Sequence, residues 1–137
     1  MISQFIATVL ALLPVVTGNI QVYERICTPG LYGQYQADTN ALIVCAGLTP
    51  DDAELTLAHE LIHAVQDAKD GINNATFAPI LTEKQREQLA TTPHGVWVNE
   101  QLTESYRGKP DYILDLEFEA WYFEEYLHQL LFHGAQF

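Results

Sequence analysis

The spacing of apolar and polar residues along the chain predicts a group of strands near its start. After an apolar stretch at residues 1–17, the segments 20–27, 31–36 and 41–46 are rich in β-branched and aromatic residues, as strands usually are. The turn-like residues 37–40 separate the last two segments, so this pair predicts an antiparallel hairpin. Because residues 41–46 (ALIVCA) are all apolar, we expect them to form a buried strand.

Helices are predicted on both sides of this hairpin. The stretch 1–17 predicts a buried N-terminal helix that is ended by Pro14, because proline lacks the amide hydrogen that a helix interior needs. After the hairpin, Thr49 and Pro50 begin a helix that we expect to run to about Lys69, with Thr49 as its N-cap. The two aspartates that follow Pro50 favour this start, since they lie at the positive end of the helix dipole.

The remainder of the chain predicts one loop and three more helices. The longest of these helices begins at Lys109-Pro110-Asp111 and is ended by Gly134. The other expected segments are a loop at 72–81 and two shorter helices near 82–90 and 96–106. We therefore predict a single α+β domain over residues 1–137. In it, a small antiparallel sheet packs against the helix that begins at Thr49 and against the long C-terminal helix.

Composition narrows the possible functions. Of the 137 residues, 48% are hydrophobic and only 18% are charged, which provides enough apolar surface for one compact core. The net charge is -12, so we do not expect a nucleic-acid partner, whose phosphates require clustered Lys and Arg. The apolar N-terminal run is shorter than the roughly 20 residues that span a bilayer, and we do not expect membrane attachment.

Two features bear on the cellular compartment. No basic residue precedes Arg25, whereas a secretory signal begins with positive charge. We therefore predict a cytoplasmic protein, and the alternative is a secreted one in which residues 1–17 act as a signal peptide. Cys27 and Cys45 lie on two predicted strands and could form a bridge. Without a clear secretion signal, however, we expect two reduced and buried thiols.

The residues that carry chemistry are concentrated in the sequence His59-Glu60-Leu61-Ile62-His63. Residues four apart lie on one face of a helix, so both imidazoles can bind the same zinc ion. Glu60 then projects beside the open position of the metal, where it can accept a proton from water. This spacing predicts a zinc site with His59 and His63 as ligands and Glu60 as the general base.

The third protein ligand has to come from elsewhere in the chain, because the metzincin pattern would need a histidine at Lys69. In the last helix, a rotation of about 100° per residue places Glu117 at the edge of an apolar stripe and turns Glu119 toward the expected solvent face. A carboxylate at a buried edge needs a positive partner, so Glu117 is the predicted third ligand. The alternatives are Glu119, Glu124, His94 and His128.

These motifs resemble the gluzincin group of zinc metallopeptidases, in which one helix supplies two histidines and a later helix supplies a glutamate from an E-x-x-A motif. Here the matching sequences are HELIH at 59–63 and EFEA at 117–120. The pattern is similar to CAAX-prenyl endopeptidases, to ImmA/IrrE-type peptidases and to short zincin-like proteins of phages and cyanobacteria. One position departs from the peptidase families, because Trp121 stands where Asp or Asn usually steadies a ligand histidine. Asp67 or Glu124 is the predicted substitute.

The resemblance implies a zincin-like fold and a zinc metallopeptidase that hydrolyses a peptide or protein substrate, with Zn²⁺ on His59, His63 and Glu117 and with Glu60 as the base. We expect the substrate backbone to lie antiparallel along an edge strand, residues 41–46. The residues expected to stabilise the oxyanion are Tyr106, Tyr112, His94 or His128. The alternative function is a non-catalytic structural or interaction module that a closed, four-ligand zinc site stabilises.

Overall fold

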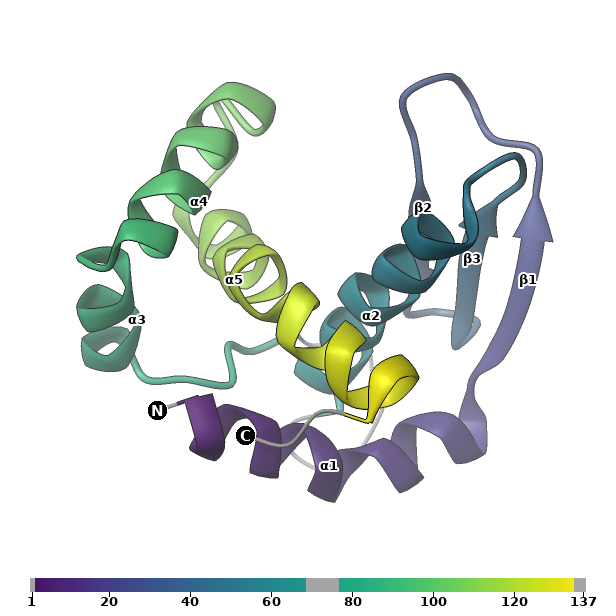
Figure 1. The fold of residues 1–137 in the computed structure, drawn as a ribbon, viewed down its shortest axis with the longest axis horizontal. Coiled ribbons are helices and arrows are strands. Elements are labelled where there is room, and N and C mark those ends of the chain that lie inside the picture. The colour runs from purple at the N-terminus through teal and green to yellow at the C-terminus, as the bar shows by residue number, and fades with distance from the viewer. Residues whose placement is uncertain (1, 69–76, 135–137) are drawn as a thin grey trace.

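The computed structural model describes residues 2–68 and 77–134, which form one α+β unit. Its elements in chain order are α1 (Ile2–Asn19), β1 (Gln21–Arg25), β2 (Gly33–Gln36), β3 (Ala41–Cys45), α2 (Pro50–Asp67), α3 (Glu83–Ala90), α4 (Pro93–Ser105) and α5 (Asp111–His133). Figure 1 shows α2 and α5 side by side at the centre, with α3 and α4 on one side, the sheet on the other and α1 beneath. The predicted α+β class is confirmed.

Helix α2 begins where the sequence predicts, because its cap is encoded locally. The hydroxyl oxygen of Thr49 accepts a hydrogen bond from the amide of Asp52 at 3.2 Å, and Pro50 occupies the first turn. The helix ends at Asp67, about two residues before the predicted end at Lys69, which lies outside the described residues. This helix therefore carries the whole sequence 59–63 in regular α-helical geometry.

The three later helices also match their predicted positions, with one shifted start. Helix α3 opens with a capping box between Thr82 and Gln85, and α5 is closed by Gly134 in a left-handed conformation. Helix α4 begins at Pro93, three residues earlier than predicted, because Thr92 caps it by accepting the amide of Gly95 at 3.0 Å. The predicted loop at 72–81 lies partly outside the described residues, and its part 77–81 is not helical.

The prediction that Pro14 ends the first helix is wrong, because α1 continues through it to Asn19. Pro14 is exposed to solvent, while Phe5 and Val9, earlier in the helix, are fully buried. Packing of this buried face stabilises the helix, and packing of this kind can outweigh the missing amide of a proline. Among the described residues, no helix has both the length and the apolar character that crossing a bilayer requires.

The sheet contains the predicted hairpin, but it is mixed and not purely antiparallel. Strands β2 and β3 pair antiparallel, whereas β1 joins the other side of β3 in parallel, which gives the order β1-β3-β2. The apolar strand β3 therefore takes the central position, with neighbours on both sides. The prediction that residues 41–46 form an edge strand open to a substrate is wrong for this reason, and β2 is the edge beside α2.

A disulfide joins Cys27, just after β1, to Cys45 at the end of β3. The parallel pairing puts Arg25 opposite Cys45, and the Cα atoms of the two cysteines are 5.5 Å apart, a spacing that suits a disulfide. The prediction of two reduced thiols is therefore wrong. It failed because the adjacency of β1 and β3 is a property of the topology, which the local sequence pattern does not reveal.

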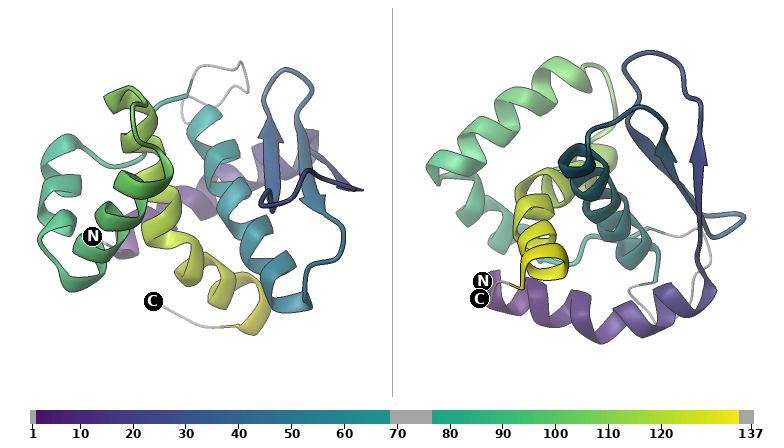
Figure 2. Two further views of the ribbon diagram at one scale, coloured as in Figure 1. Left: turned by 90° about the horizontal axis from the view of Figure 1, so that it is seen from above. Right: turned by 45° about the vertical axis from the view of Figure 1, so that its right-hand side comes forward.

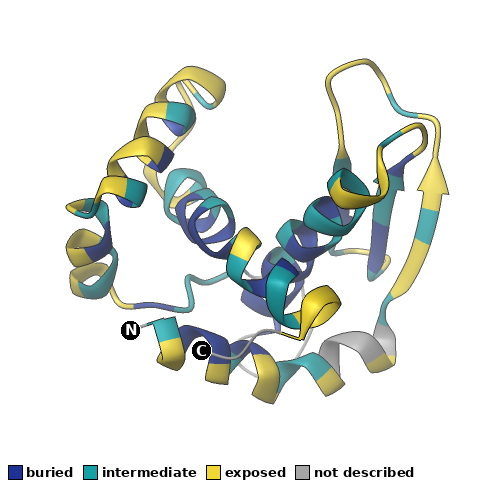
Figure 3. Ribbon diagram, in the orientation of Figure 1, coloured by how far each residue is buried: buried dark blue, intermediate teal, exposed yellow. Residues whose placement is uncertain are grey.

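The main core lies where α1, α2 and α5 meet, and it sets the relative position of α2 and α5. The rings of Phe5 and Phe123 stack with their centroids 3.7 Å apart, while Ile62, Val65 and Leu127 are fully buried. Figure 3 shows buried residues on the sides of α2 and α5 that face each other, and both views of Figure 2 place α2 between α5 and the sheet. Tight packing of this kind leaves little freedom for the two helices to shift.

Candidate metal centre

The two histidines of the HExxH sequence point toward a single carboxylate on α5. The Nε2 atom of His63 is 2.9 Å from Glu117 Oε1, and the Nε2 atom of His59 is 3.3 Å from Glu117 Oε2. One ligand atom from each of the three residues lies within 4.8 Å of the other two. The structure thus brings together His59, His63 and Glu117, the three residues that the sequence predicts as zinc ligands.

The remaining nitrogen of each imidazole is held by a hydrogen-bond acceptor. His59 Nδ1 donates to Glu124 Oε2 at 2.7 Å, and His63 Nδ1 donates to the side-chain oxygen of Gln66 at 2.8 Å. A proton kept on Nδ1 by its acceptor lets Nε2 exchange its own proton for a cation, and this is the arrangement found behind most metal-ligating histidines. Glu124 therefore contacts His59 as predicted, whereas Asp67 binds the hydroxyl of Tyr35 at 2.8 Å.

The electrostatics of the three residues suit a cation. Although burial favours the neutral form of Glu117, its contacts with His59 and His63 hold its pKa far below the ordinary value. Burial lowers the pKa of His59, but the hydrogen bonds to Glu117 and Glu124 outweigh it and raise that pKa to about 10. Glu117 Oε2 is buried, and its contact with His59 Nε2, at 3.3 Å, is longer than the 2.9 Å contact between Glu117 Oε1 and His63, so this oxygen is the more loosely held acceptor of the carboxylate. Two imidazoles and one carboxylate are a donor set that zinc prefers.

Glu60 lies beside this group and is held by the edge of the sheet. Its side chain is buried, and its carboxylate accepts a hydrogen bond from the backbone amide of Tyr35 in β2. Burial raises the pKa of Glu60 above the usual range, while the neighbouring histidines oppose that shift. A carboxylate with a raised pKa and a position next to the group is suited to accept and return a proton.

Strand β2 approaches α2 so closely at Gly33 that no side chain fits there. A Cβ atom on this residue would lie 2.5 Å from Thr56 Cγ2 and 2.7 Å from the carbonyl oxygen of Ile43. The glycine therefore allows the contact that brings the amide of Tyr35 to Glu60. This role was not predicted from the sequence, although an isolated glycine inside a predicted strand, here 31–36, is a recognised signal for close approach.

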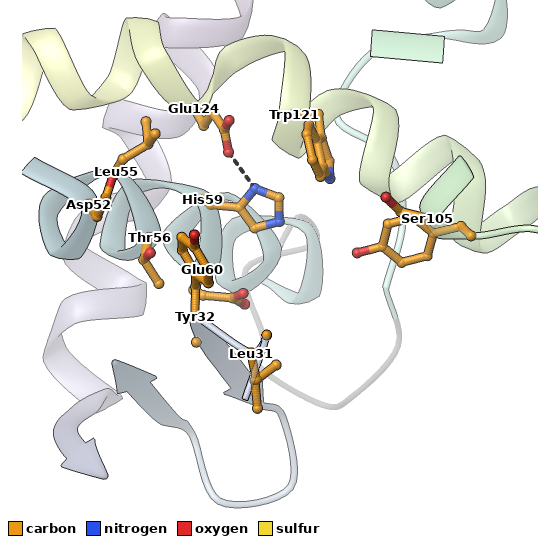
Figure 4. A pocket seen from close by; sticks show the side chains of 13 residues that line it. Leu31, Tyr32, Asp52, Leu55, Thr56, His59, Glu60, Ser105, Trp121 and Glu124 are labelled. Carbon is orange, nitrogen blue, oxygen red and sulfur yellow. Dashed lines mark hydrogen bonds and ion pairs between the residues drawn. The ribbon is translucent and has the colours of Figure 1, made fainter. Parts of the chain in front are cut away.

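Two adjoining cavities lie at the site and share Gly33, His59, Glu60 and Tyr106 in their walls. The larger is about 620 Å³ and is lined by the loop before β2, by α2 and by α5, and the smaller is about 310 Å³ and reaches His63 and Glu117. Figure 4 shows His59 in the larger cavity, with Trp121 of α5 on one side and Leu31 and Tyr32 on the other. The position that departs from the peptidase families, Trp121, thus forms part of the cavity wall.

One site prediction, that Glu119 faces solvent, is wrong. This carboxylate is fully buried and accepts the backbone amides of Ile80 and Leu81 at 2.8 and 2.6 Å, and also the side-chain amide of Gln66 at 3.0 Å. Burial raises its pKa, and these donors partly compensate. The segment before α3 covers the side of α5 that the helical pattern assigned to water, so Glu119 supports the site and lies outside the ligand group.

The other ligand and helper candidates occupy different places. His94 contacts the carbonyl oxygen of Tyr122 at 3.1 Å, and His128 contacts Glu54 at 3.0 Å, so neither belongs to the group around Glu117. Tyr112 is 65% exposed. Tyr106 lines both cavities, and its pKa is raised by burial and by the nearby Glu117 carboxylate. Of the four predicted oxyanion helpers, Tyr106 is therefore the one positioned at the site.

The contact between Gln66 and His63 was not predicted from the sequence. Gln66 follows His63 by three residues, which places both side chains on the same face of α2, and this spacing was the available signal.

Comparisons with protein-family models, with curated proteins and with solved structures found no significant match to this chain. What the protein does has to be argued from the chemistry of the site.

Proposed function

We propose that the protein is a zinc-dependent metallopeptidase. The observation that carries the proposal is the convergence of two imidazole Nε2 atoms on Glu117, with each Nδ1 held by an acceptor and with Glu60 beside them at an open cavity. When bound by His59, His63 and Glu117, zinc would act as a Lewis acid that polarises a peptide carbonyl and lowers the pKa of a water molecule.

The residues of the chain have separate tasks in this proposal. Glu60 accepts a proton from the attacking water and transfers it to the amine that leaves when the peptide bond breaks. Tyr106, which lines both cavities, donates a hydrogen bond to the oxygen of the attacked carbonyl. The products are one new carboxylate and one new amine, so each hydrolysed bond consumes one water molecule.

The edge strand β2 gives the substrate backbone a place to pair. The amide of Cys45 donates to the carbonyl oxygen of Tyr32, and this bond sets which residues pair by hydrogen bonds along β2 and β3. Gly33 and Tyr35 are one and three residues after Tyr32, so their backbone groups point away from β3. The amide of Tyr35 contacts Glu60, and the backbone groups of Gly33 lie beside the larger cavity. We propose that an extended peptide adds to β2 at Gly33, in place of the predicted pairing with β3.

A substitution at Glu60 separates metal binding from hydrolysis. Glu60→Gln keeps the size of the side chain but removes its basicity, so the variant should bind zinc normally and lose cleavage of unfolded proteins and of fluorogenic peptide libraries. Glu87→Gln, an exposed glutamate on α3, is the matched control and should behave as the unmodified protein. His63→Ala should lose cleavage together with the zinc ion held at Glu117. Normal turnover by Glu60→Gln would contradict the proposal.

The alternative is a non-catalytic zinc module with a closed site of four protein ligands. The group around Glu117 contains three such residues within the described part of the chain, and His94 and His128 lie elsewhere. X-ray absorption of the zinc-loaded protein distinguishes the two functions. Three protein ligands plus water support the peptidase, and four protein ligands support the structural module.

The Cys27–Cys45 disulfide is relevant to the cellular compartment of the protein. Disulfides persist mainly in oxidising environments, so the Cys27–Cys45 bridge favours the secreted alternative over a cytoplasmic protein. Fractionation of cells that produce the tagged full-length chain, with alkylation of free thiols before lysis, measures the location and the redox state together. A reduced cytoplasmic pool would favour the cytoplasmic location instead.

A further inference from the structure

A second group of histidines and carboxylates lies at the other end of the same helix pair. Asp51 and Glu54 come from the first turns of α2, and His128 and His133 come from the last turns of α5. One ligand atom from each of these four residues lies within 4.8 Å of the other three. The left view of Figure 2 shows the start of α2 beside the end of α5, as expected for two antiparallel helices.

The two histidines are arranged like the pair in the first group. The ring centroids of His128 and His133 are 5.0 Å apart with an interplanar angle of 80°, while those of His59 and His63 are 5.0 Å apart at 76°. His128 Nε2 is 3.0 Å from Glu54 Oε1, and His133 Nε2 is 3.7 Å from the same oxygen. The Nε2 atoms of both rings therefore face one carboxylate, as they do at Glu117.

A further carboxylate lies behind the buried histidine. His128 is buried, and its Nδ1 atom faces Glu125 Oε2 at 3.6 Å without a hydrogen bond to any described residue. A carboxylate that accepts from Nδ1 orients the ring and strengthens Nε2 as a ligand, as Glu124 does for His59 at 2.7 Å. Glu125 would take this role for His128 if a bound ion drew the two side chains from 3.6 Å into hydrogen-bond distance. Among the described residues, the ion pairs of Glu54 are with His128 and His133 and with no lysine or arginine, so a bound cation would balance the carboxylates.

We propose that Asp51, Glu54, His128 and His133 bind a second divalent metal ion of the zinc type. Imidazole and carboxylate ligands together suit zinc and similar transition metals better than calcium or magnesium, which prefer oxygen alone. The ion connects the first turns of α2 to the last turns of α5. It therefore fixes the outer end of the two helices that carry His59, His63 and Glu117, and it has no part in hydrolysis.

Metal counting tests this second site directly. The purified protein, freed of metal and titrated with Zn²⁺, should bind two ions per chain. The double variant Asp51→Asn, His133→Gln alters two exposed side chains and should bind one ion, held by the first group. His63→Ala should also bind one ion, held by the second group. His94→Gln, a histidine outside both groups, is the control and should bind two.

A variant that keeps all four ligands tests whether Glu125 supports the second site. Glu125→Gln alters an exposed side chain that is not a ligand, and it should weaken zinc at the second site by about tenfold in chelator competition. Zinc should also raise the melting temperature of His63→Ala but not that of His63→Ala combined with the double variant. A single ion in the unmodified protein and none in His63→Ala would overturn the proposal, whether or not the protein is a peptidase.

Discussion

The Nδ1 atom of His63 lies 2.8 Å from the side-chain oxygen of Gln66, and the amide nitrogen of Gln66 donates to Glu119 and to the carbonyl of Leu116. The ring of a predicted zinc ligand is thus oriented by a chain of hydrogen bonds that ends on α5. Because α5 also carries Glu117, one helix positions both the ring of His63 and the carboxylate that the ring faces. The contact makes Gln66 a positioning residue in the proposed metal site.

Gln66→Met should therefore lower the zinc affinity of the first site by about 10- to 100-fold, since the substitution keeps the approximate volume but removes the acceptor for His63. The measurement is competition with a chromophoric chelator. Gln88→Met, on the exposed side of α3, is the matched control. Unchanged affinity in a variant with normal circular dichroism would mean that His63 is oriented by packing alone.

Glu124 makes the corresponding contact with His59. Substitutions of Glu124 test whether its negative charge or its hydrogen bond supports zinc binding by His59. Glu124→Gln retains an acceptor oxygen, so we expect a smaller loss of zinc affinity than for Glu124→Leu, which should lose about tenfold. The exposed Glu100→Leu on α4 should have no effect. Equal losses in the two Glu124 variants would show that the negative charge matters more than the hydrogen bond.

Tyr106→Phe should reduce kcat by about 100-fold and leave KM nearly unchanged, because the lost hydrogen bond forms mainly in the transition state. Tyr112→Phe, at a residue that is 65% exposed, is the control for loss of a tyrosine hydroxyl. Steady-state kinetics on a peptide substrate separate the two constants. A rise in KM at constant kcat would instead assign Tyr106 to substrate binding.

Gly33→Ala should destabilise the protein by about 1–3 kcal/mol, because the new methyl group would lie 2.5 Å from Thr56 Cγ2 and force β2 away from α2. Chemical denaturation measures the change in the free energy of unfolding. Gly18→Ala, where no atom lies within 4 Å of the added Cβ, is the control and should be neutral or slightly stabilising. Equal stability of both variants would show that β2 can shift without cost.

Removal of the disulfide should cost about 2–4 kcal/mol of stability but should not affect the first metal site. The bridge spans 18 residues and holds β1 to β3, whereas His59, His63 and Glu117 lie on α2 and α5. Urea unfolding of the Cys27→Ser, Cys45→Ser variant measures the first effect, and zinc titration measures the second. Loss of zinc binding in this variant would show that the sheet helps to position Glu60 and the ligands.

The positions that the sequence predicts well are those set by local helical geometry. The four-residue spacing of His59 and His63 and the angular position of Glu117 follow from the 3.6-residue repeat, and the structure places these side chains together. The caps at Thr49 and Gly134 are also encoded within a few residues. For these features, neighbours in the sequence decide the geometry.

The features that the sequence did not predict depend on neighbours that are distant in the chain. Glu119 is buried because the backbone amides of Ile80 and Leu81 need an acceptor, and the pattern along α5 contains no information about that segment. In the same way, the disulfide and the central position of β3 depend on how β1 returns to the sheet. A helical wheel assigns faces by average polarity and cannot identify a buried carboxylate that loop amides satisfy.

Glu117 and Glu119 are separated by a single residue on α5, yet one faces the histidines and the other accepts the amides before α3. Each residue added to a helix rotates all that follow by about 100°. An insertion or deletion of one residue anywhere between α4 and Glu117 that shifted the helical phase would therefore misdirect both carboxylates together. Apart from Tyr106, this stretch of the chain should tolerate changes of residue type far better than changes of length.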